Sequence, residues 1–146
     1  MVGNSFAYGP RRGRAFIAGG GGNRFGICLR KSHEGDGPTI VVEGVLANAF
    51  QYMTGGVALV LGPVGFNLGS GMTGGRLYLL EPALAMLNPK YVHTLPLTPA
   101  DVDLVQSLLD EHLRSTASPT AERLLRSFDP DRFARVETRL APEALL

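Results

Sequence analysis

Recurrent glycines constrain this chain more than any other feature of its sequence. The residues Met-Thr-Gly-Gly occupy positions 53–56 and return at 72–75, an offset of 19 residues (72 minus 53). The run at 39–44 resembles the run at 58–62 in the same way, with its closing glycine 18 residues later (62 minus 44). A short fixed period is typical of one structural unit that stacks on its own copy.

Each unit combines an apolar run of four or five residues with the glycines that follow it. A strand of that length buries too little surface alone, and glycine accepts the positive φ angles of a tight corner. Short strands joined by glycine corners at this period predict the stacked turns of a parallel β-helix, also called a β-solenoid. We therefore expect a mainly β fold.

Two residues among these corners have side chains of interest. Asn67 is expected to take a left-handed corner or to form a ladder with a polar residue of an adjacent turn. Glu43 is expected to accept hydrogen bonds from backbone amides at a corner. A catalytic acid is the less favoured reading of Glu43, because no second carboxylate or histidine lies near it in the sequence. The other positions of this structural motif are Gly44, Gly55, Gly56, Gly62, Gly65, Gly69, Gly71, Gly74 and Gly75.

The composition changes near residue 82, after which helical periodicity begins. A hydroxyl N-cap followed by proline at N1 predicts helices that start at Thr98-Pro99 and at Ser118-Pro119. Phe133 and Val136 are expected to anchor the remaining tail. We predict one domain in three parts: a partly mobile arm (1–15), the glycine-rich turns (16–82) and a helical C-terminal segment (83–146).

The bulk composition excludes several functional classes. A net charge of +1 gives no reason to expect nucleic acid as a partner, and no apolar run approaches the length of a membrane span. Cys28 is the only cysteine, so a reducing compartment is expected. With no signal-peptide pattern at its start, the chain is expected to be cytoplasmic.

Three patterns that suggest chemistry have simpler explanations. Residues 69–74 fit G-x-G-x-x-G, but the run after them reads as a strand, whereas a dinucleotide site needs a helix there. Cys28 lies between Ile27 and Leu29, which suggests a core strand and no nucleophile. The three histidines lack metal-ligand spacing. We therefore expect no catalytic residue, no cofactor and no metal.

Several motifs in order resemble the C-terminal Gly-repeat (GXGXG) domain of the glutamate synthase large subunit. They are Gly-Asn-Arg-Phe-Gly-Ile at 22–27, Thr-Ile-Val-Val-Glu-Gly-Val at 39–45 and the glycine segments at 52–56, 62–67 and 71–75. The resemblance covers residues 16–139. It implies a short right-handed single-stranded parallel β-helix with a C-terminal helical tail.

The resemblance also implies a role. The chain is expected to be a non-catalytic scaffold subunit of a glutamate-synthase-like oxidoreductase complex in nitrogen metabolism. Its expected partners are amidotransferase or flavin-dependent synthase subunits. Compared with the family, several N-terminal turns are missing, so the exposed end is expected to bind a partner or to self-associate.

The chain departs from the family at two other places. Leu46 and Ala49 replace glycines after Val45, so one corner is expected to be built differently, and residues 31–38 form a longer, protruding loop. An alternative reading, from another functional class, is a self-contained homo-oligomeric domain. Such a domain would bind a small anionic metabolite in a glycine-lined groove.

Overall fold

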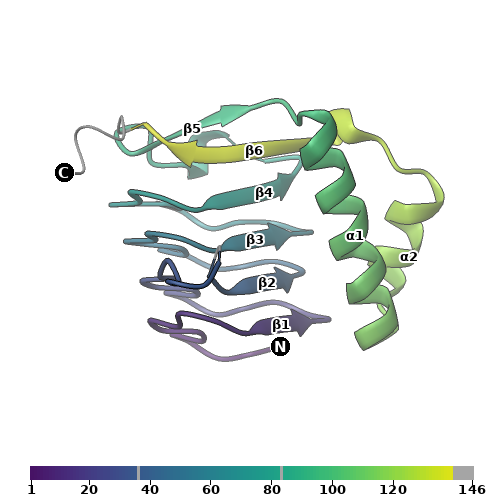
Figure 1. Ribbon diagram of the computed structural model, residues 1–146, viewed down its shortest axis with the longest axis horizontal. Helices are drawn as coiled ribbons and strands as arrows, with labels where there is room; N and C mark the ends of the chain where they lie inside the picture. Colours follow the sequence, from purple (N-terminus) through teal and green to yellow (C-terminus); the bar gives the residue numbers. More distant parts are fainter. Residues whose placement is uncertain (36, 83, 140–146) are drawn as a thin grey trace.

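Four short parallel strands lie one above another in the computed structural model, which describes residues 1–35, 37–82 and 84–139 (Figure 1). They are β1 (Arg14–Ile17), β2 (Thr39–Val42), β3 (Val57–Val60) and β4 (Arg76–Leu80). Residue 39 pairs with 57, and 57 pairs with 76. The offsets of 18 and 19 residues seen in the sequence are therefore the register of the sheet. We call each strand with the loop before it a rung: residues 1–19, 20–43, 44–61 and 62–81.

The predicted β-helix fold is wrong. The strands form one open, mixed six-stranded sheet in the order β1-β2-β3-β4-β6-β5, in which β5 (Val92–Leu95) and β6 (Phe133–Thr138) pair antiparallel. The parallel register stops at β4, because the neighbour of β4 is β6, which returns from beyond the helices. The glycine repeat accounts for the four parallel strands and not for β5 or β6. Phe133 and Val136 do anchor the segment after the helices, because both are buried, and they do so as residues of β6.

Two α-helices cover one face of this sheet (Figure 1). Helix α1 spans Pro99–Thr116 and α2 spans Pro119–Arg126, and both start where the sequence predicted. The hydroxyl of Thr98 accepts from the amide of Asp101, whose carboxylate accepts from the Thr98 amide in return. This capping box satisfies two amides at the helix start that would otherwise lack partners. Short 3-10 helices occur at Leu84–Met86 and Pro130–Arg132.

Both faces of β2, β3 and β4 are buried, which explains their apolar runs. Alternate residues point to opposite faces: Ile40 and Val42 pack against the loops of the rungs, whereas Val41 packs against the helices. The same alternation continues through Leu77, Tyr78 and Leu79. The molecule thus has three layers: loops, sheet and helices.

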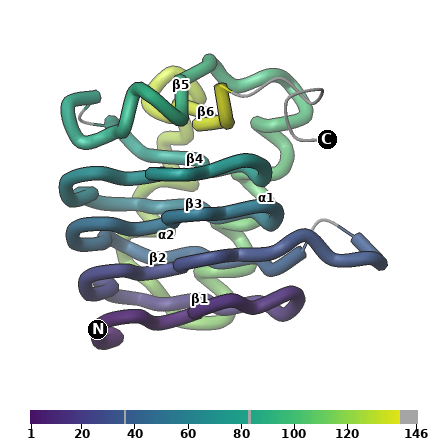
Figure 2. The backbone as a smooth tube through the Cα atoms, turned by 90° about the vertical axis from the view of Figure 1, so that its left-hand side faces the viewer, coloured from purple at the N-terminus to yellow at the C-terminus, as the bar shows by residue number. Residues whose placement is uncertain are grey.

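The N-terminal residues belong to the first rung, and part of the loop of the second rung protrudes from the sheet-and-loop layers. The amides of Val2 and Gly9 donate to the carbonyls of Gly20 and Ile27, which joins the first rung to the second. Residues 32–35 protrude from the second rung (Figure 2), and Asp36, within the predicted loop, lies outside the described residues. The domain boundaries after residues 15 and 82 stay predictions, and the last predicted part runs beyond residue 139, where the description ends.

Candidate functional site

The loops of the four rungs share one backbone pattern that the sequence analysis missed. In each loop, residues at i, i+2 and i+4 have positive φ angles between 55° and 78°. In the second and third rungs the amides of these residues donate alternately to the next rung and to the previous one; for example, Asn48 donates to Phe66 and Phe50 to Phe25. The left-handed positions are Ser5, Ala7, Gly9, Arg24, Gly26, Cys28, Asn48, Phe50, Tyr52, Asn67, Gly69 and Gly71.

This pattern changes two expectations. Cys28 does not lie in a strand: it occupies a left-handed corner at φ 59°, between the buried Ile27 and Leu29. The corner after Val45, expected to be built differently for want of glycines, follows the same alternation as the others. Because most of these positions are not glycine, counting glycines could not reveal the pattern.

Other motif glycines lie where stacked segments of the backbone approach one another most closely. A Cβ atom added at Gly62 would lie 2.2 Å from the Glu43 carbonyl oxygen, and one at Gly74 would lie 2.4 Å from that of Thr54. At Gly65 it would lie 2.4 Å from the carbonyl carbon of Leu46. Any side chain there would collide with backbone, so these glycines set the spacing of the rungs.

Asparagines form a ladder across the loops. The Nδ2 of Asn67 donates to Oδ1 of Asn48 at 3.0 Å, and the Nδ2 of Asn88 donates to Oδ1 of Asn67 at 2.8 Å. In the first two rungs, Oδ1 of Asn4 accepts from the amide of Asn23. Asn67 has a φ of 63° and thus combines the left-handed corner and the ladder that were expected as alternatives.

A glycine-lined cleft of about 510 Å³ lies where the third and fourth rungs turn into their strands. Its glycines come from the two Met-Thr-Gly-Gly segments, and Thr54 and Thr73 add hydroxyl groups. The side chains of Lys31 and Arg76 also line it. Arg76 is partly neutralised, because its guanidinium lies 3.9 Å from Oδ1 of Asp101. The two cationic residues therefore make the cleft moderately positive, which suits a small anion.

Glu43 joins the sheet to both helices. Its carboxylate accepts a hydrogen bond of 2.9 Å from the Ser118 hydroxyl at the start of α2 and lies 3.6 Å from Nε2 of His112 on α1. These partners are side chains, not the backbone amides expected from the sequence. His112 and Ser118 are fully buried. Burial lowers the pKa of His112, and the Glu43 carboxylate offsets only part of that effect.

These three side chains do not form a nucleophilic triad. In such a triad the histidine accepts the hydroxyl proton and the acid orients the histidine. Here the hydroxyl donates to the acid, and both ring nitrogens of His112 lack a hydrogen-bond partner. The group is a buried structural contact. A signal for it in the sequence is the spacing of His112, which follows the buried Leu108 and Leu109 of α1 by four and three residues and so lies on the same face of the helix.

A second polar cluster surrounds Asp101, which is 2% exposed. Its carboxylate accepts from the Tyr78 hydroxyl at 2.6 Å and from Arg135 at 3.0 Å. Burial would raise the pKa of Asp101, but hydrogen bonds from Tyr78 and Thr98, together with the Arg135 charge, outweigh burial and lower it. For Tyr78, burial and the same hydrogen bond raise the pKa. The cluster connects β4, β6 and α1.

Three sequence expectations can be compared directly with the described residues. The segment 69–74 is followed by strand β4, as predicted, so it lacks the helix of a dinucleotide fingerprint. In the described ranges no group of three or more His, Cys, Asp or Glu side chains could hold a metal ion. Among the same residues, no helix has the length and apolar character that a membrane crossing requires.

The corner pattern and the close glycine contacts define a glycine-repeat domain. The family model of the GXGXG motif matches residues 1–138, and the chain belongs to that family. The ferredoxin-dependent glutamate synthase of Pyropia yezoensis is 36% identical over 133 residues. Ferredoxin-dependent glutamate synthase 2 of Synechocystis sp. is 33% identical over 132 residues. The glutamate synthase [NADPH] large chain of Bacillus subtilis is 32% identical over 134.

Each of these matches covers 88% of this chain but 8% of the relative. The chain is therefore a glutamate-synthase-related domain that spans a small part of the length of the relatives it matches.

Proposed function

We propose that the chain is a non-catalytic scaffold that docks to amidotransferase or flavin-dependent synthase subunits of a glutamate-synthase-like assembly in nitrogen metabolism. One observation carries the proposal: the carboxylates of Glu43 and Asp101 are engaged in holding the layers together. Glu43 and Asp101 each connect the sheet to helices through side-chain contacts. A catalytic acid would instead face a cleft that admits substrate.

The open sheet gives the scaffold surfaces through which it can dock. Strands β1 and β5 are the two ends of the strand order. A strand at a sheet edge presents unpaired N–H and C=O groups that another chain can bind. Docking at one of these edges, or self-association there, would cover such groups.

The test uses the chain and glutamate-synthase-type subunits from the same source, coexpressed and passed through a sizing column. We expect co-elution in fixed stoichiometry and no turnover by the chain alone. Cys28→Ala and Glu43→Gln chains that still fold should support the assembled activity fully. Turnover by the isolated chain, or its elution apart from every such subunit, would rule the scaffold role out.

A second candidate function is binding of a small anionic metabolite in the glycine-lined cleft by a homo-oligomer of this chain. The side chains of Lys31 and Arg76 in that cleft favour it. Thermal-shift measurements with phosphate and with dicarboxylates test it, using Lys31→Ala as the variant and the exposed Lys90→Ala as the matched control. Stabilisation that Lys31→Ala abolishes would support this function, and its absence would exclude it.

A further inference from the structure

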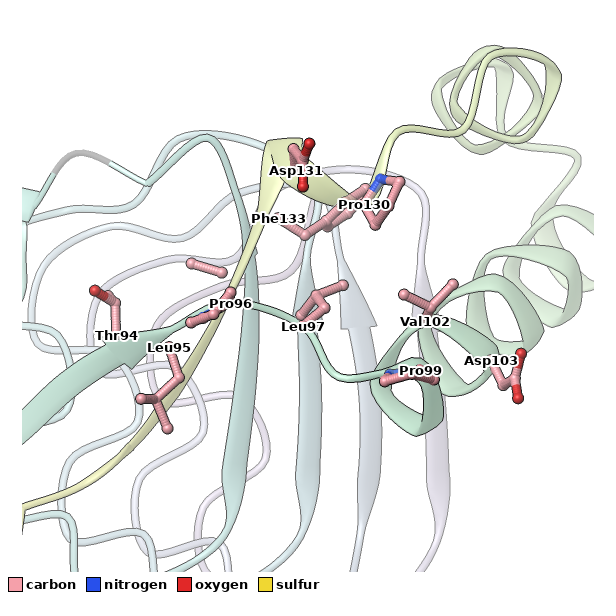
Figure 3. A pocket seen from close by; sticks show the side chains of 11 residues that line it. Thr94, Leu95, Pro96, Leu97, Pro99, Val102, Asp103, Pro130, Asp131 and Phe133 are labelled. Atoms are coloured by element: carbon pink, nitrogen blue, oxygen red, sulfur yellow. The ribbon is translucent and has the colours of Figure 1, made fainter.

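An apolar groove of about 660 Å³ lies where β5 and β6 meet the start of α1 (Figure 3). The groove is separate from the glycine-lined cleft, because the two share no lining residue. Leu95 comes from β5, Leu97 from the segment that leads into α1, and Val102 from the first turns of that helix. Phe133 of β6 completes the apolar lining.

Away from the β5 edge, the backbone around the groove offers few hydrogen-bond donors. Pro96, Pro99 and Pro130 line it, and proline has no backbone N–H. A ligand held mainly by polar groups would find few partners there. An occupant with apolar side chains would lose little by leaving water and would gain from burial against leucine, valine and phenylalanine.

The groove also has a charge preference. Exposed Asp103 and Asp131 line it, and no Lys, Arg or His does. Within the described residues no ion pair involves either carboxylate. Opposite charges across an interface favour association and exclude partners of the wrong sign. The groove therefore favours a cationic occupant, which is the reverse of the glycine-lined cleft.

An open strand edge borders the groove. Strand β5 is the last strand in the order and pairs on one side, with β6. Thr94 and Leu95 of this strand belong to the groove lining. An extended segment can add to such an edge through main-chain hydrogen bonds while its alternate side chains enter neighbouring pockets.

We infer that this groove docks an extended segment of a partner protein that carries an apolar side chain next to lysine or arginine. The segment pairs with β5, places its apolar side chain against Leu97 and Phe133, and sets its cation near Asp103 and Asp131. This inference rests on the proposed scaffold function and specifies where and by what chemistry the partner is held.

The test selects peptides from a random displayed library on the immobilised chain and measures their affinity by fluorescence polarisation. We expect selected peptides to pair an apolar residue with a neighbouring Lys or Arg. The double variant Asp103→Lys/Asp131→Lys should weaken their binding about tenfold or more. Asp110→Lys, on the same helix but outside the groove, is the matched control. Acidic peptides, or affinity indifferent to the double variant, would overturn the inference.

The coexpressed subunits separate this inference from the function on which it rests. A complex that forms with the wild-type chain and dissociates with Asp103→Lys/Asp131→Lys supports both. A complex that still forms with the double variant would refute docking in the groove and would be consistent with the scaffold role. Peptides that bind the groove, together with no complex with any synthase-type subunit, would refute the scaffold role and support peptide docking in the groove. A homodimer that the double variant breaks would show that a second copy occupies the groove, against the inference.

Discussion

The Ser118 hydroxyl donates to Oε1 of Glu43 at 2.9 Å and accepts from the amide of Ala121 at 3.1 Å. One buried hydroxyl thus caps α2 and ties it to the residue that follows β2. Because Gly44 comes directly after Glu43 and lies against Pro63 of the fourth rung, the contact places both helices relative to the glycine corners.

Ser118→Ala is expected to destabilise the chain by about 1–3 kcal/mol, since it removes a helix cap and a hydrogen bond to a charged group. Urea unfolding followed by circular dichroism measures the change. Ser107→Ala, at an exposed position of α1, should change the free energy of unfolding by less than about 0.5 kcal/mol. Equal losses for the two variants would show that the Ser118 contact contributes nothing.

His112 should make stability depend on pH between the ordinary histidine pKa and more acidic values. Because burial lowers the pKa of His112 in the folded chain, the unfolded chain binds more protons below about pH 6.5. The free energy of unfolding should therefore be complete above that pH and fall on acidification, by at most about 1.4 kcal/mol per pH unit for one proton.

His112→Leu tests this dependence. The variant should lose the slope below about pH 6.5, while His93→Gln on β5 should keep it. At neutral pH the leucine variant should be nearly as stable as the wild type, because neither ring nitrogen of His112 has a hydrogen bond to lose. An unchanged slope in His112→Leu would assign the dependence to another group.

Asp101→Asn should destabilise the chain by about 1–3 kcal/mol, because it removes the buried charge that Tyr78 and Arg135 contact and leaves Arg135 with the more exposed Glu137 as its only ion-pair partner among the described residues. The lowered pKa of Asp101 means that its contribution is complete above the ordinary aspartate range and is lost as the pH falls through the folded value. Denaturation at pH 7 and pH 3 measures both effects. Asp103 lies two residues further along α1 and is exposed. Asp103→Asn should therefore change the free energy of unfolding little.

The parts of the fold that the sequence predicted depend on local signals. The starts of α1 and α2 follow from Thr98 and Ser118 with the prolines after them, and the register of β2, β3 and β4 follows from the repeat. Strand β6 could not be predicted this way. Its pairing with β4 joins residues more than 50 positions apart, for example Leu77 with Val136, and no local pattern encodes such a contact.

The site was harder still to predict, because its contacts join residues far apart in the sequence. Ser118 and Glu43 are 75 residues apart, and Tyr78 and Asp101 are 23 apart. Glu43 was singled out for its place beside a corner, but its partners could not be named. The left-handed corners could not be predicted for another reason. Residues such as Arg24 and Phe50 have positive φ angles, and a sequence pattern predicts such angles mainly for glycine.

Arg24→Gly should therefore stabilise the chain. Arg24 is exposed and has a φ of 56°, which costs a residue with a Cβ about 1–2 kcal/mol. Glycine removes that cost but loses about 0.5–1 kcal/mol of conformational entropy, so a net gain of about 0.5–1 kcal/mol is expected in urea unfolding. Arg30→Gly, exposed but outside the left-handed positions, should instead lose about that amount. A loss of stability in Arg24→Gly equal to that in Arg30→Gly would mean that the left-handed corner carries no strain for arginine to release.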